Sequence, residues 1–121
     1  DDASVEIREP GPGRGVVCLV SADFEHGSEL TSSLGEHGVT SEAVGHRAAK
    51  GMKHFIDSNA ADGRYLADQL LLPMALAGGG EFTTMKPDNH VATNISVITQ
   101  FLPVNFRIDD GDRGKKIIRV S

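Results

Sequence analysis

The sequence has a single cysteine, no long apolar run and no excess of positive charge, and each absence excludes something. One cysteine, Cys18, permits neither an intrachain disulfide nor a cysteine-based metal cluster. It lies among the apolar residues 16–20, where a small buried hydrophobe is a better interpretation than a reactive thiol. No stretch reaches the roughly 18 apolar residues of a transmembrane helix, and no signal peptide is recognisable. We therefore expect a cytoplasmic protein that makes no membrane contact.

The charge balance argues against a protein that is held on nucleic acid by phosphate contacts alone. Twelve Lys and Arg residues against 17 Asp and Glu residues give a formal net charge of −5, whereas such binders carry basic surfaces. An enzyme that grips only one end of a nucleic acid, or whose basic groove lies elsewhere, stays compatible. The 121 residues fit one domain or a large subdomain. Because the chain starts at Asp1 and not at Met, we expect a fragment or a processed piece of something longer.

The spacing of apolar residues predicts both strands and helices. Thr40 or Ser41 can cap a first helix and Asp62 a second, shorter one, which Pro73 should end or kink. The last two strands are expected to form a hairpin. Strands are expected at residues 5–8, 16–24, 81–85, 104–108 and 117–120, helices at residues 41–59, 62–72 and 89–102, and a polar loop at residues 25–39.

With the short helix set aside, the main elements follow the order βαβαββ. This order predicts a fold of the mixed α/β class, arranged as an α+β sandwich. The helices of one βαβαββ unit would pack on one face of a mixed four-stranded sheet. Residues 1–121 would form a single unit of this kind, and no internal repeat is visible within them.

His90 stands in the expected first turn of the third helix. Thr93 and Asn94 share its face at offsets of three and four residues, whereas Val91 and Ile95 belong to a core stripe. Free backbone N–H groups at a helix start bind phosphate, and the positive end of the helix favours the uncharged imidazole that a nucleophile requires. A histidine that only caps the helix has the same spacing, and the spacing alone favours that alternative.

A second polar cluster lies on the second helix, where Tyr65, Asp68 and Gln69 share one face. A ring beside a carboxylate and an amide suits a nucleobase, because the ring can stack while the polar groups read the base edge or the ribose. A solvated helix face with one amphipathic tyrosine is the simpler alternative, and the spacing by itself favours it.

Other candidate signals are weaker. The glycine-rich residues 11–15 lack the Gly-Lys-Ser/Thr ending of a phosphate-binding loop, and residues 78–80 are best interpreted as a plain loop. The remaining histidines, at positions 26, 37, 46 and 54, have no convincing set of partners for a metal ion. We therefore predict no metal site within the chain.

Longer motifs resemble a known family. Residues 65–78, which read YLADQLLLPMALAG, and residues 90–94, HVATN, followed by FLPV at 101–104, are similar to signature stretches of the RNA 3′-terminal phosphate cyclases. Residues 11–15 and 38–42 are also similar to that family. The resemblance covers nearly the whole chain, and its motifs are long and specific.

The resemblance implies an ATP-dependent enzyme that converts an RNA 3′-phosphate into a 2′,3′-cyclic phosphodiester. In that family the histidine of a His-x-x-Thr-Asn motif attacks the α-phosphate of ATP and becomes AMP-histidine, which assigns His90 as the catalytic nucleophile. The Tyr-Leu-Ala-Asp-Gln segment lines the adenylate site, which assigns this role to Tyr65, Leu66, Ala67, Asp68 and Gln69. ATP and a divalent cation, Mg²⁺ or Mn²⁺, are the implied cofactors. The implied partners are RNA 3′-phosphate ends and the remainder of the same enzyme, with a homo-oligomer left open.

Two alternatives and one departure accompany this interpretation. Cyclase-like proteins that act in ribosome assembly share the fold but lack the nucleophilic histidine motif, and an enolpyruvyl transferase would be a relative at the level of the fold. The segments around Tyr65 and His90 favour the cyclase. However, the chain matches only the C-terminal third of such an enzyme, and the family's N-terminal basic residues, which help to hold the phosphates, are absent. We therefore expect the isolated 121 residues not to cyclise RNA.

Overall fold

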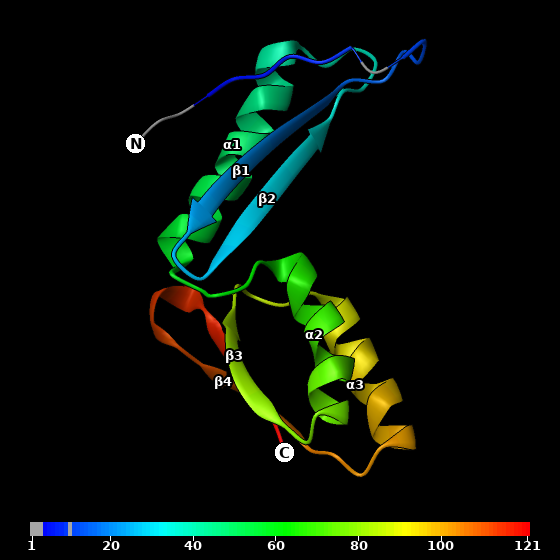
Figure 1. Cartoon of the computed structure of the whole chain (residues 1–121), viewed down its shortest axis with the longest axis vertical. Helices are drawn as coiled ribbons and strands as arrows, with labels where there is room; N and C mark the ends of the chain where they lie inside the picture. The colour runs from blue at the N-terminus through cyan, green and yellow to red at the C-terminus, as the bar shows by residue number, and fades with distance from the viewer. Residues whose placement is uncertain (1–3, 10) are drawn as a thin grey trace.

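The computed structural model describes residues 4–9 and 11–121. Within them the chain forms two halves (Figure 1), one built from β1, β2 and α1 and the other from the remaining elements. The elements are β1 (Val17–Phe24), β2 (Gly27–Leu34), α1 (Ser41–Ser58), α2 (Arg64–Leu76), β3 (Gly80–Thr84), α3 (Asn89–Phe101), β4 (Phe106–Asp110), the short 3₁₀ helix η1 (Asp112–Gly114) and β5 (Lys116–Val120).

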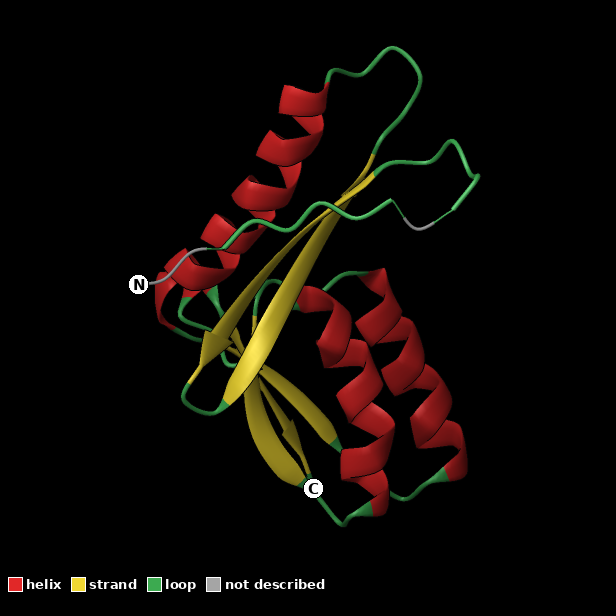
Figure 2. Ribbon diagram, turned by 45° about the horizontal axis from the view of Figure 1, so that its top comes forward, coloured by secondary structure: helices red, strands yellow, loops and turns green. Residues whose placement is uncertain are grey.

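In the first half, β1 and β2 form an antiparallel hairpin that α1 covers on one face (Figure 2). The side chains that β2 turns toward α1 are small and polar. The hydroxyl of Thr31 donates a hydrogen bond to the carbonyl of Ala48 at 2.8 Å, and Ser33 is buried. Leu30 and Leu34 lie on the opposite, exposed face of the same strand.

Two expectations for this half are wrong. Residues 27–34 form a strand where the sequence pattern predicts part of a polar loop, and residues 5–8 have no regular secondary structure where it predicts a strand. The loop prediction fails because β2 buries its polar residues and exposes its leucines, which inverts the pattern of a half-buried strand. The strand exists through its pairing with β1.

In the second half, β3, β5 and β4 form a three-stranded antiparallel sheet in that order, and α2 and α3 pack side by side against it (Figure 1). Leu71, Val91 and Ile118 are fully buried at the centre of this core. The antiparallel pairing of β4 with β5 confirms the predicted closing hairpin.

The mixed α/β class is confirmed, but the predicted sheet is wrong. The described residues form two small antiparallel sheets and not one mixed four-stranded sheet. The reason is that β1 pairs with its hairpin neighbour β2 and makes no ladder with the β3–β5–β4 sheet.

The first and third helices agree with their prediction, and the second differs at both ends. Thr40 caps α1 by accepting a hydrogen bond from the Ala43 N–H at 3.3 Å. At α2, by contrast, Gly63 and not Asp62 occupies the N-cap position, and the helix continues through Pro73 to Leu76. Ala75 is buried beyond the proline, so packing on the core sustains the last turn that the proline weakens.

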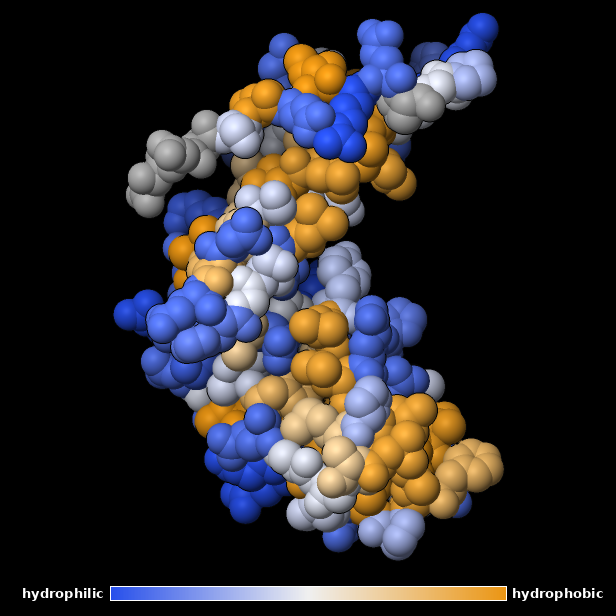
Figure 3. Space-filling view, in the orientation of Figure 1, coloured by the Kyte–Doolittle hydropathy of each residue, from blue (hydrophilic) through white to orange (hydrophobic). Residues whose placement is uncertain are grey.

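The two halves meet through a small core made by Met52 and Phe55 of α1 and by Met85, which follows β3. The segment that joins α1 to α2 also pairs with β3, because Asp62 forms a β-bridge with Thr84. Both α2 and α3 begin at this junction and run away from it in the same direction (Figure 1). Their outer surface is apolar in part (Figure 3), with Leu72, Leu76, Val97 and Phe101 exposed.

Candidate functional site

His90 occupies the first turn of α3, and its side chain is exposed. Asp88 caps the helix, since its Oδ1 accepts a hydrogen bond from the backbone N–H of His90 at 2.9 Å. Val91, the next residue, is fully buried in the core. These two anchors fix the rotation of the helix start, and they leave the imidazole facing solvent, as an attacking group requires.

Tyr65 lies in the first turn of α2 and is 67% exposed. Its ring faces the guanidinium group of Arg64, whose Cζ lies 4.9 Å from the ring centroid. The side-chain amide of Gln69 donates a hydrogen bond to the Tyr65 carbonyl at 3.1 Å, one turn back along the helix. The ring is therefore accessible to solvent, and a hydrogen bond within the helix holds the Tyr65 backbone.

The other members of the predicted adenylate segment differ in exposure. Leu66 is exposed and Asp68 half-buried, but Ala67 is fully buried in the core. Ala67 therefore holds the helix against the sheet, and its methyl group does not face solvent. Whether the segment binds adenylate stays a prediction.

The two predicted segments lie at the same end of the helix pair. The Arg64 guanidinium, from the first residue of α2, lies 3.8 Å from Oδ2 of Asp88, the N-cap of α3. Both side chains are partly exposed, so the pair contributes at most about 1 kcal/mol to stability. Its main consequence is geometric, because one aspartate contacts both helix starts.

A cavity of about 620 Å³ borders this end of α2, between the β1–β2 turn and the end of α1. Leu66 lines it together with three acidic residues, Glu25, Glu29 and Asp62. Burial raises the pKa of Glu29 and of Asp62 above their ordinary values. The sequence offers no local signal for Glu29, because it reaches the start of α2 only through the fold.

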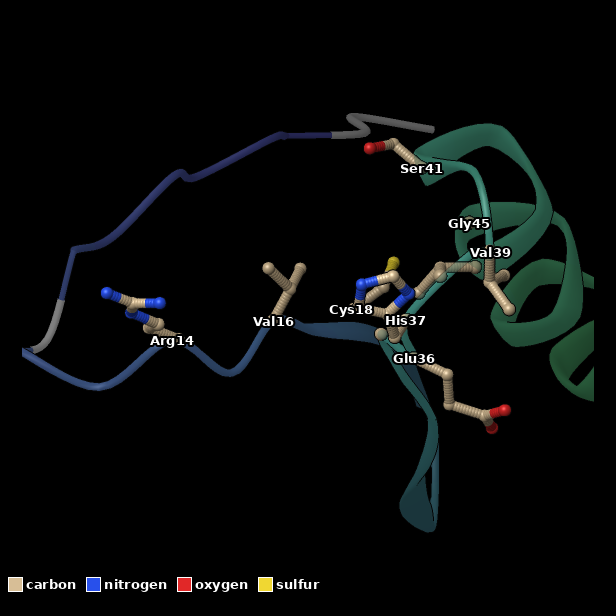
Figure 4. Close-up of a pocket in the computed structure, with 10 residues that line it drawn as sticks. Arg14, Val16, Cys18, Glu36, His37, Val39, Ser41 and Gly45 are labelled. Carbon is tan, nitrogen blue, oxygen red and sulfur yellow. The ribbon is translucent and has the colours of Figure 1, made fainter.

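A separate pocket of about 360 Å³ lies between the start of β1 and the start of α1 (Figure 4). Arg14, Cys18, His37 and Ser41 are among the residues that line it. Cys18 is half-buried there and not fully enclosed. None of the residues predicted from the sequence for catalysis or adenylate binding lines this pocket.

No metal site accompanies the two helix starts. Across residues 4–9 and 11–121, no group of three or more His, Cys, Asp and Glu side chains could hold a metal ion. These residues alone therefore do not fit a divalent cation, and no chemical step is assigned to one here. In the same described ranges, no helix has both the length and the apolar character needed to cross a membrane.

A mixed α/β fold with an accessible histidine at one helix start and an accessible aromatic ring at the neighbouring one is compatible with a nucleotide-handling protein. The family model for RNA 3′-terminal phosphate cyclase matches residues 12–108. The chain belongs to the RNA 3′-terminal phosphate cyclase family, which confirms the resemblance seen in the motifs.

One similar curated protein is the RNA 3′-terminal phosphate cyclase of Ralstonia nicotianae. It is 42% identical over 118 residues, which are 98% of this chain and 34% of that relative. The chain thus spans about a third of the length of the relative that it matches.

Proposed function

We propose that this chain supplies the nucleophile and part of the adenylate surface of an ATP-dependent enzyme that cyclises RNA 3′-phosphate ends. The observation that carries the proposal is the placement of two exposed side chains, His90 and Tyr65, at the same end of two adjacent helices. Family membership supports ATP and RNA as the substrates. A cytoplasmic location is part of the proposal and follows only from the sequence.

The proposed reaction has three steps. Nε2 of uncharged His90 attacks the α-phosphorus of ATP, an N–P bond forms, and pyrophosphate leaves. The RNA 3′-phosphate then attacks the same phosphorus, which breaks the N–P bond and leaves AMP on the RNA end. Finally the neighbouring 2′-hydroxyl loses its proton and attacks the activated 3′-phosphate, and AMP departs as the ring closes. Because the hydroxyl is already adjacent, proximity supplies much of the rate of this last step.

The local structure suits the first step. The starts of α2 and α3 carry partial positive charge, which favours phosphate groups bound beside them. The exposed ring of Tyr65 offers a stacking surface for adenine, and the buried Val91 leaves the neighbouring His90 exposed to solvent. The proposed role of the chain is therefore to orient the base and the nucleophile.

Covalent labelling tests the proposal. We expect a full-length protein that carries this segment to acquire label from α-labelled ATP through a bond that is stable in alkali and lost in acid. His90→Ala should lose the label. The matched control is His46→Ala, which removes an exposed histidine of α1 and should label like the wild type.

Equal labelling of His90→Ala and the wild type would exclude His90 as the nucleophile. A wild-type protein that takes up no label would instead favour a non-catalytic, cyclase-like role in ribosome assembly.

A further inference from the structure

Glu29 of β2 reaches from the first half of the molecule to the start of α2. Its carboxylate lies close enough to the backbone of Gly63 and of Leu30 that both lower the pKa of the carboxyl group in part. A Cβ atom built on Gly63 would lie only 2.7 Å from both Cδ and Oε1 of Glu29. The carboxylate is thus packed directly against the residue that precedes α2.

Helix α2 has no cap of its own. Gly63 occupies the N-cap position, is buried and has no side chain to bond the first turn. A side-chain oxygen at this place stabilises a helix by about 1 kcal/mol, and a negative charge adds to the effect through the helix dipole. Glu29 brings a carboxylate to this position from another element of the fold.

The turn that Glu29 contacts also carries the proposed adenylate residues. Arg64, Tyr65 and Leu66 follow Gly63 directly, and Arg64 contacts the aspartate that caps the helix of His90. We propose that Glu29 is a positioning residue, which holds the first turn of α2 in the orientation that binds the adenine nucleotide. This inference rests on the function proposed above.

The position of Glu29 is not that of a freely solvated glutamate. Burial raises the pKa of its carboxyl group, the nearby backbone of Gly63 and Leu30 lowers it in part, and the charge of Asp62 raises it further. Ionisation of Glu29 at this position therefore costs desolvation free energy, and the contacts with the backbone offset part of that cost.

Steady-state labelling with ATP tests the inference in the full-length protein. Glu29→Ala should raise the apparent KM for ATP severalfold, because the first turn of α2 loses the side chain that packs against Gly63. The maximal rate should change less than the KM, because the reacting atoms stay in place. Glu29→Gln keeps a polar oxygen beside Gly63 and should recover most of the loss. The matched control is Glu25→Ala, an exposed glutamate in the turn of the same hairpin, which should behave like the wild type.

A second variant, Gly63→Ala, disturbs the contact between Glu29 and Gly63 by changing Gly63 instead of Glu29. The backbone of Gly63, with φ −69° and ψ 162°, suits alanine, but the added methyl group would displace the Glu29 carboxylate. Gly63→Ala should therefore raise the KM as Glu29→Ala does, and the double variant should be no worse than either single one. An unchanged KM in Glu29→Ala, or fully additive effects, would overturn the inference.

Amide hydrogen exchange separates this inference from the proposed function. In Glu29→Ala, but not in Glu25→Ala, the Gly63 amide should exchange severalfold faster, because the carboxylate no longer covers it. Absence of label in the wild type would remove the proposed function and with it the nucleotide-positioning role. Normal labelling of the wild type with unchanged exchange at Gly63 would remove only the role of Glu29.

Discussion

Glu29 and Asp62 are the two carboxyl groups whose pKa is raised by burial in the described residues. An acid with a raised pKa in the folded state binds its proton more tightly there than in the unfolded chain. Its contribution to stability is therefore complete below the unfolded pKa, which for glutamate is about 4.3. The contribution is lost as the pH rises through the folded pKa, so both acids should weaken the fold at neutral pH.

Glu29→Gln tests this sign at a single residue. The amide cannot ionise, so it avoids the cost of burying a charge while it keeps an acceptor oxygen beside Gly63. We expect the variant and the wild type to have similar free energies of unfolding below about pH 4, and the variant to be the more stable at pH 7. Urea unfolding at the two pH values measures the difference. A variant that is less stable than the wild type at pH 7 would show that the charge stabilises the helix start more than burial penalises it.

At the scale of helices and strands, the sequence predicts what depends on neighbours along the chain. Thr40 caps α1 as the local pattern predicts, and the third helix begins where its apolar spacing places it, with Asp88 as its cap. In contrast, β2 could not be predicted, because Thr31 and Ser33 are buried against α1 while Leu30 and Leu34 are exposed. Only the position of α1, which is set by contacts distant in sequence, decides which face of that strand is inside.

The cap of α3 gives a prediction at the same scale. Asp88→Ala should lower the free energy of unfolding by about 1 kcal/mol, because the His90 N–H loses its acceptor. Asp88→Ser should keep most of that stability. The control is Asp57→Ala on α1, which removes only an exposed ion pair with Lys53 and should cost less than about 0.5 kcal/mol. Denaturant unfolding of the three variants checks the order, and an Asp88→Ala variant as stable as Asp57→Ala would contradict it.

For the molecule as a whole, the α/β class and the motif residues follow from the sequence, whereas the arrangement of the sheets does not. The apolar run that becomes β1 has the composition of a central strand in a larger sheet. Among the residues that the structure describes, however, β1 pairs only with β2, and Val17 and Leu19 are exposed. The choice between these partners depends on long-range packing that local patterns do not encode. The approach of His90 and Tyr65 to one end of a helix pair is a result of the same packing.

The activity of the 121 residues alone depends on how well they neutralise phosphate charge. Phosphoryl transfer depends on positive groups that stabilise the charge on the transferred phosphate. Here the net charge is −5, the Arg64 guanidinium beside the site contacts Asp88, and the described residues contain no candidate metal cluster. We therefore expect the isolated chain, given ATP, Mg²⁺ and an RNA with a 3′-phosphate, to form no cyclic end, whereas the full-length protein should form it. Chromatography of the RNA ends after both incubations measures this. The relative that the chain matches is about three times as long. Turnover by the isolated chain would mean that these 121 residues neutralise the phosphates by themselves, and it would contradict this prediction.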